Sequence, residues 1–183
     1  MTSHPQKPGP RTARIAEMLR VDHAGEYGAV SIYRGQRAVF DVLAHKQETA
    51  AKIAEMEAGE DAHLETFDKL LAEREVRPTL LAPLWNAAGF GLGAATALMG
   101  EKAAMACTAA VEDVIEKHYA EQAEALQADE PALAATMREF REDELSHKHE
   151  AEASGASEAP GYALLSAAIK AGCRAAIKVS EKV

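Results

Sequence analysis

The sequence contains little cysteine and few aromatic residues. Its 183 residues include two cysteines, Cys107 and Cys173, one tryptophan and 5% aromatic residues in all. Two cysteines provide neither a disulfide framework nor a thiolate metal site, so the composition favours a reducing compartment. Because 48% of the residues are hydrophobic, the chain can build one ordinary hydrophobic core without a covalent staple.

An excess of positive charge is also missing. The 20 lysines and arginines and the 29 aspartates and glutamates give a net charge of −9. Proteins that bind nucleic acid neutralise phosphates with a basic face, so this balance argues against a nucleic-acid partner. No long apolar run follows the proline-rich residues 1–11. We therefore expect them to form a flexible N-terminal arm rather than a secretory signal, followed by a single domain over residues 12–183.

Residues 78–100 form a long stretch without any charged residue. A helix that spans a membrane needs about 20 apolar residues, and this stretch has that length. Pro83, Asn86 and several glycines make it a poor spanning helix. A helix on the membrane surface, with Trp85 as an interfacial anchor, fits better. A buried helix of a soluble core fits equally well, so the sequence leaves these two alternatives open.

Helix-forming residues dominate the chain, and no stretch alternates apolar and polar residues with a period of two. We therefore expect an all-α fold. Two antiparallel hairpins joined by the charge-free crossover helix predict a ferritin-like four-helix bundle with two additional helices. The expected helices cover residues 12–44, 46–75, 78–100, 101–128, 131–152 and 159–180.

Two Glu-x-x-His motifs point to metal chemistry. Glu60 and His63 lie in the second expected helix, and Glu144 and His147 lie in the fifth. Residues three positions apart share a helix face, so the carboxylate and the imidazole of one motif can meet the same ion. One such motif is weak evidence in a chain rich in glutamate. Two motifs, each in the second helix of a hairpin, are stronger evidence.

The first helix of each hairpin offers a single glutamate among small residues. Glu26 precedes the first motif by 34 residues, and Glu112 precedes the second by 32. A tyrosine follows each glutamate by seven residues, Tyr33 in one hairpin and Tyr119 in the other. Seven residues are about two helical turns, so each tyrosine should lie on the face of its glutamate. The two hairpins therefore form an internal repeat, in which each contains one glutamate, one tyrosine and one Glu-x-x-His motif.

The resulting set of donors holds four carboxylates and two imidazoles. Two divalent ions would neutralise the four carboxylates, which lowers the cost of burying the site. Oxygen and nitrogen donors without sulfur suit iron or manganese, and bridging carboxylates can hold two ions about 3.5–4 Å apart. We predict a two-metal centre with six ligands: Glu26, Glu60, His63, Glu112, Glu144 and His147.

Four neighbouring residues carry separate expectations. Asp143 lies one turn before His147 and could orient an imidazole. His118 could border the site. His23 is expected to be an ordinary helix histidine rather than a partner of the metal centre, and Glu57 a solvated carboxylate.

Three segments resemble the demethoxyubiquinone hydroxylase family, the di-iron monooxygenases of ubiquinone biosynthesis. They are LRVDHAGEYGAVSIYRGQ (residues 19–36), CTAAVEDVIEKHYAEQ (residues 107–122) and FREDELSHKHEA (residues 140–151). The resemblance extends over nearly the whole chain and includes all six predicted ligands. It implies a 3-demethoxyubiquinol 3-hydroxylase, which uses O2 to hydroxylate a polyprenyl methoxy-benzoquinol ring in the penultimate step of ubiquinone biosynthesis.

The same resemblance implies cofactors and partners. Two iron ions per chain are expected, with O2 and a reductant such as NADH as co-substrates. As a separate hypothesis on the mechanism, Tyr119, or less readily Tyr33, is the candidate catalytic residue beside the metal, with packing in the core as the alternative. A peripheral location is implied, on the cytoplasmic face of a bacterial inner membrane or the matrix face of a mitochondrial one. Residues 78–100 would then meet the membrane and admit the tail, and a homo-oligomer or a quinone-biosynthesis complex is also expected.

A different function on the same fold remains as the alternative. A ferritin-like protein that stores iron or destroys peroxide would use similar ligands. It would not need a charge-free crossover helix, and it would act without any quinone.

Overall fold

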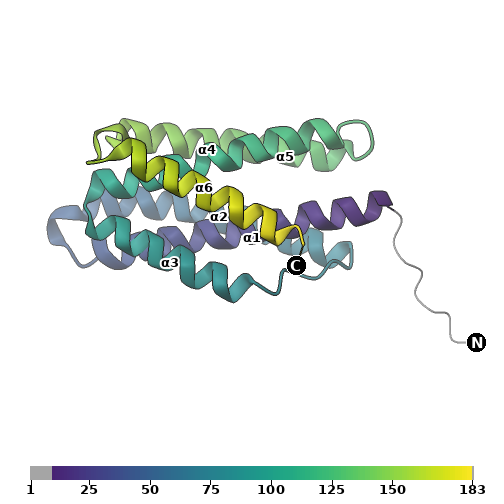
Figure 1. The fold of residues 1–183 in the computed structure, drawn as a ribbon, viewed down its shortest axis with the longest axis horizontal. Coiled ribbons are helices and arrows are strands. Elements are labelled where there is room, and N and C mark those ends of the chain that lie inside the picture. Colours follow the sequence, from purple (N-terminus) through teal and green to yellow (C-terminus); the bar gives the residue numbers. More distant parts are fainter. Residues whose placement is uncertain (1–9, 183) are drawn as a thin grey trace, which may run out of the picture.

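The computed structural model describes residues 10–182, which form six α-helices without any strand (Figure 1). The prediction of an all-α fold with six helices is confirmed. The arm predicted over residues 1–11 lies outside the described residues except for Pro10 and Arg11, which begin the first helix. The helices are α1 (Pro10–Phe40), α2 (Gln47–Glu73), α3 (Ala82–Leu98), α4 (Glu101–Leu126), α5 (Pro131–Ala153) and α6 (Tyr162–Ser180), with short 3-10 helices η1 (Ala44–Lys46) and η2 (Ala156–Glu158).

The helix boundaries follow from local chemistry. Proline at position 131 opens α5, where its missing N–H and fixed φ fit the first turn. The turn between α3 and α4 depends on Gly100, whose φ of 112° is accessible to glycine and strained for other residues. Helix α2 ends shortly before Pro78, as the restriction on residues that precede proline predicts.

The helices form two hairpins with one extra helix on each. Helices α1 and α2 pack as one hairpin, and α4 and α5 pack as the other. Helix α1 also meets α4, and α2 meets α5, so these four helices enclose a common interior. Helix α3 lies mainly along α1, and α6 lies mainly along α4 (Figure 1). No helix among residues 10–182 is both long and apolar enough to cross a membrane.

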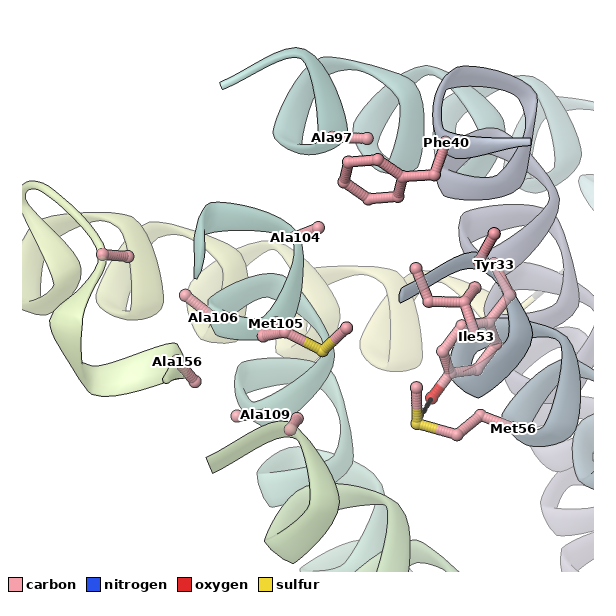
Figure 2. Packing of buried hydrophobic residues seen from close by; sticks show 13 residues of the cluster. Tyr33, Phe40, Ile53, Met56, Ala97, Ala104, Met105, Ala106, Ala109 and Ala156 are labelled. Carbon is pink, nitrogen blue, oxygen red and sulfur yellow. Dashed lines mark hydrogen bonds between the residues drawn. The ribbon is translucent and has the colours of Figure 1, made fainter. Parts of the chain in front are cut away.

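Two apolar clusters occupy the two ends of this interior. One contains Phe40, Ile53 and Met105 together with many alanines of α4 (Figure 2). The other contains Leu19, Phe67 and further large side chains from α4 and α5. Residues 103–110 of α4 are all buried, and most of them are alanines, whose small side chains let the other helices approach closely.

Helix α3 approaches α1 so closely that only glycine fits at the contact. A Cβ at Gly93 would overlap the carbonyl oxygen of Ile32, and one at Gly89 would lie 2.7 Å from the carbonyl oxygen of Gly28. These obstacles are backbone atoms, which cannot move aside as a flexible side chain can. The glycines of the charge-free segment therefore fix its position against the helix that carries Glu26.

Replacing Gly93 with alanine is expected to lower the free energy of unfolding by about 1–3 kcal/mol, because the added methyl forces the two backbones apart. The matched control is Gly91→Ala in the same helix, where a Cβ meets no atom within 4 Å. That variant should be neutral or gain up to about 1 kcal/mol from better helix propensity. Urea unfolding of both variants measures the difference, and equal stabilities would contradict the proposed packing constraint.

Candidate metal centre

The structure brings all six predicted ligands together in the middle of the molecule. Helix α1 contributes Glu26, α2 contributes Glu60 and His63, α4 contributes Glu112, and α5 contributes the last two. Their donor atoms form two groups, and within each group the atoms lie within 4.8 Å of one another. The first group is Glu26, Glu60, His63 and Glu144, and the second is Glu60, Glu112, Glu144 and His147. Both groups share Glu60 and Glu144.

The two halves of the centre have matching geometry. In the first half, Nδ1 of His63 lies 3.3 Å from Glu144 Oε1 and 3.7 Å from Glu60 Oε2. In the second half, Nδ1 of His147 lies 2.9 Å from Glu60 Oε1 and 3.6 Å from Glu144 Oε2. Each imidazole thus faces a carboxylate of the opposite hairpin as well as the one in its own motif. This is the arrangement that a pair of ions with shared carboxylates requires.

The buried donor atoms fit a divalent metal pair. All four glutamates are at most 1% exposed, yet each has at least one carboxylate oxygen without a hydrogen-bond partner. Nδ1 of His63 and Nδ1 of His147 also lack partners. Unpaired buried polar atoms are costly, and native proteins rarely keep them without a ligand, an ion or a water. Here they gather at one place and have the chemistry of iron or manganese ligands.

Electrostatics lead to the same interpretation. Burial, followed by the charge of Glu60, raises the pKa of Glu26 to about 8. Burial and the charge of Glu144 raise the pKa of Glu112 well above its usual value. Burial lowers the pKa of His147, but hydrogen bonds with Glu144 and Glu60 outweigh it and raise that pKa to about 10. Glu26 and Glu112 thus hold protons unless other positive charge replaces them.

Each tyrosine of the internal repeat bonds to the opposite hairpin. The Tyr33 hydroxyl donates to Glu112 Oε1 at 2.6 Å, and the Tyr119 hydroxyl donates to Glu26 Oε1. Burial raises the pKa of both phenols well above the usual value, so they remain protonated donors. Two helical turns separate each tyrosine from its own glutamate, which is about 10 Å and too far for a hydrogen bond. The sequence spacing alone therefore could not identify these partners.

The neighbours of the centre differ in part from expectation. Asp143 Oδ2 lies 3.1 Å from Nε2 of His63, so it orients the imidazole across the hairpins rather than that of His147. His23 is buried, and it pairs with the exposed Asp68 rather than with any of the six donors. The prediction that Glu57 is solvated is wrong, because it is buried between α1 and α2 and paired with Arg34 and Arg37.

Sequence reasoning missed a buried polar group beside Glu26. Asp22 lies one turn before that glutamate and accepts a hydrogen bond from Gln122 Nε2 at 2.7 Å. His118 Nε2 lies 3.3 Å from the same Asp22 oxygen, so His118 borders the interior as expected. The signal was present in the sequence, because Asp22 and Gln122 extend the helix faces of Glu26 and His118 by one turn.

An apolar groove runs beside the centre. It has a volume of about 490 Å³ and lies between α1, α3, α4 and α6. Gly25 and Gly28, which flank Glu26, form part of its wall, and a Cβ at either position would meet no atom within 4 Å. Such a volume is within the range of about 300–1,000 Å³ typical of small-molecule sites. The groove can therefore accept an apolar molecule next to the helix that carries Glu26.

Comparison with known proteins links these features to a family. The family model described as "Ubiquinone biosynthesis protein COQ7" matches residues 13–180. The chain is 53% identical over 179 residues to the 3-demethoxyubiquinol 3-hydroxylase of Rhodospirillum rubrum, covering 98% of this chain and 82% of that protein. It is 44% identical over 175 residues to the human mitochondrial NADPH-dependent 3-demethoxyubiquinone 3-hydroxylase, covering 93% and 79%. It is 37% identical over 189 residues to the mitochondrial 5-demethoxyubiquinone hydroxylase of Saccharomyces cerevisiae, covering 94% and 80%.

Proposed function

The chain belongs to the COQ7 family of ubiquinone biosynthesis proteins, and on this premise we propose that it hydroxylates 3-demethoxyubiquinol with a pair of bound iron ions. One atom of O2 becomes the ring hydroxyl and the other leaves as water, with two electrons and two protons from a reductant. The observation that carries this proposal is the pair of overlapping donor groups with unpartnered, buried carboxylate oxygens and imidazole nitrogens. Such a centre suits reactions with O2 at the end of an apolar groove.

In this proposal each donor has a defined role. Glu26 and His63 would hold one ion, Glu112 and His147 would hold the other, and Glu60 and Glu144, which belong to both donor groups, would serve both ions. The donors suit iron and manganese alike, and the resemblance to di-iron hydroxylases favours iron. When bound, the two ions reduce and activate O2. The charge balance supports two divalent ions, since four carboxylates carry four negative charges.

The chain's own residues prepare the site for this chemistry. Tyr119 and Tyr33 donate to Glu26 and Glu112, which fixes the orientation of the two terminal carboxylates. We propose Tyr119 as a catalytic residue, because its hydroxyl donates to Glu26 on α1, one of the helices that line the groove. Asp143 holds the His63 ring through Nε2, which leaves Nδ1 free for the ion. The cluster that contains Ile32, Val111 and Ile169 also lines the groove, so it excludes water from the reacting ring.

The proposed substrate site is the apolar groove, with the quinol ring near Gly25 and Gly28 and the first part of the polyprenyl tail along α3 and α6. Helix α3 carries no charge, and Leu84, Phe90 and Leu98 are exposed on it. Exposed apolar side chains on a helix of this kind favour contact with a membrane surface. We therefore propose a peripheral protein that takes its substrate from the bilayer, on the cytoplasmic face in bacteria or the matrix face in mitochondria.

We further propose that residues 12–183 act as one domain, since α3 and α6 both pack on the hairpins that supply the donors. The expected homo-oligomer or quinone-biosynthesis complex stays a prediction.

Metal uptake is expected to release protons. Without metal, the raised pKa values keep Glu26, Glu112, His63 and His147 largely protonated near neutral pH. Ligands must be deprotonated to bind, so loading two ferrous ions should release up to about four protons per chain. The apparent affinity should accordingly rise between about pH 6 and pH 8 as proton competition weakens. Anaerobic calorimetry in buffers of different ionisation enthalpy measures the release, and an affinity independent of pH would contradict the ligand assignment.

Genetic complementation tests the proposed function in cells. In a bacterium that lacks its own hydroxylase and accumulates demethoxyubiquinone, this chain should restore ubiquinone, whereas a variant without the shared carboxylates should not. No restoration, with rapid oxidation of ferrous iron or loss of peroxide by the purified protein, would instead support the iron-storage or scavenging alternative.

A further inference from the structure

Two helices that form the sides of the apolar groove are joined by one side-chain hydrogen bond. The Trp85 indole Nε1 donates to Ser180 Oγ at 3.1 Å, and within residues 10–182 no other side-chain hydrogen bond joins α3 to α6. Both residues line the groove. The bond connects the first turn of α3 to the last residue of α6, and in Figure 1 the C-terminal end of α6 lies near the beginning of α3.

The two helices are otherwise anchored separately. Helix α3 lies on α1 through the glycine contacts at Gly89 and Gly93, and α6 lies mainly on α4. The two sides of the groove therefore rest mainly on different hairpins, α3 on the first and α6 on the second. Ser180 is buried, Trp85 is partly buried, and the rest of the groove wall is almost entirely apolar. The Trp85–Ser180 hydrogen bond is thus the one side-chain hydrogen bond between α3 and α6 among residues 10–182, and it lies within an apolar wall.

A long polyprenyl tail has to enter a groove that is shorter than the tail, and the Trp85–Ser180 bond lies on the path by which it would enter from the side. A groove of about 490 Å³ holds the ring and only part of such a tail, so the remainder must extend beyond the groove. A tail of that length is placed into a groove more easily from the side than by threading from one end. Sideways access requires α3 and α6 to part at the point where the Trp85–Ser180 bond joins them.

We infer that the Trp85–Ser180 hydrogen bond is a strap across the substrate groove, which parts to admit the polyprenyl quinol and re-forms over it. This inference rests on the proposed function, because it takes the groove as the substrate site. Trp85 and Ser180 are positioning residues, and they touch none of the six metal donors. A neutral hydrogen bond has a modest net strength, so it can open and close on the time scale of substrate exchange.

The strap makes a kinetic prediction that a purely structural role does not. The bond is present in both the free and the loaded groove and is broken only while the substrate passes. Removing it should therefore speed association and dissociation together and leave the dissociation constant nearly unchanged. A bond that only stabilised the loaded groove would speed dissociation alone and weaken binding.

Trp85 supplies the signal for the test, because it is the single tryptophan of the chain. The full chain, loaded with iron and kept free of O2 so that no turnover occurs, is mixed in a stopped-flow instrument with a demethoxyubiquinone that carries a long polyprenyl tail, dispersed in detergent micelles. Quenching of the indole fluorescence by the quinone reports binding. The Ser180→Ala variant should raise both rate constants about threefold to tenfold, as expected for loss of one neutral hydrogen bond. Ser180→Thr keeps the hydroxyl and should restore the wild-type rates.

Ser166→Ala is the matched control, since Ser166 is also buried in α6 but does not line the groove. It should bind at wild-type rates. Equal rates in wild type and Ser180→Ala would overturn the strap, and so would an absence of quenching in the wild type. Hydroxylation is measured separately with O2 present. Faster association and dissociation in Ser180→Ala without any ring product from the wild type would support the strap and contradict only the proposed function.

Discussion

Replacing Glu144 with alanine is expected to remove most bound iron and to abolish hydroxylation while leaving the helix content unchanged. Glu144 belongs to both donor groups and is fully buried, so its loss affects both ions. Removing a residue that only supports a ligand typically costs about tenfold to a hundredfold in metal affinity or activity. Loss of a shared carboxylate should exceed that range. The fold should persist, because the variant also removes the energetic cost of burying one of four crowded carboxylates.

Iron analysis after anaerobic loading, turnover and circular dichroism together test this prediction. Glu142→Ala is the control, because Glu142 lies two residues away on the same helix with a side chain that is 70% exposed. It should retain wild-type iron content and activity. Wild-type turnover by Glu144→Ala would contradict the assignment of the six ligands.

Replacing Gly28 with leucine is expected to block the quinone reaction while leaving the metal centre intact. The position faces the groove, and a side chain there meets open space rather than protein atoms. The leucine should therefore occupy the volume that we assign to the substrate. A change of one methylene in an apolar substrate pocket is worth about 1–3 kcal/mol, so this larger change should lower kcat/KM by about a hundredfold or more.

Gly91→Leu provides a close comparison. Gly91 also lies within a helix, and a Cβ added there also meets no atom within 4 Å, but this residue does not line the groove. Its kcat/KM should stay near that of the wild type. Iron content should be normal in both variants, which separates loss of the substrate site from loss of metal. Equal activities would show that the quinol ring binds elsewhere.

The helices and the convergence of the six donors could be predicted because their signals are local. Proline and glycine mark the helix ends, as at Pro131 and Gly100. The spacing of Glu60 and His63 places both side chains on one face of a helix wherever that helix lies. The repeat of the same spacing at Glu144 and His147 was enough to predict that two hairpins face each other.

Contacts between distant segments could not be predicted in this way. Periodicity places a side chain on a helix face but does not give its partner. Two contacts show this limit. Tyr119 bonds to Glu26 on the opposite hairpin, and Asp143 contacts His63 rather than His147. From its sequence position alone, Glu57 resembles a surface carboxylate, because the sequence does not show that Arg34 and Arg37 pair with it.

The most direct test of the proposed hydroxylation uses iron-loaded protein and isotopically labelled O2. Two ferrous ions per chain are added without oxygen, followed by a short-tailed demethoxyubiquinone and NADH or NADPH, the reductant named for the human relative. Labelled O2 then starts the reaction, and mass spectrometry identifies the ring product. We expect a hydroxylated ring that carries one labelled oxygen atom per molecule. Consumption of O2 without a labelled ring product, in protein that has retained both ions, would contradict the proposed hydroxylation.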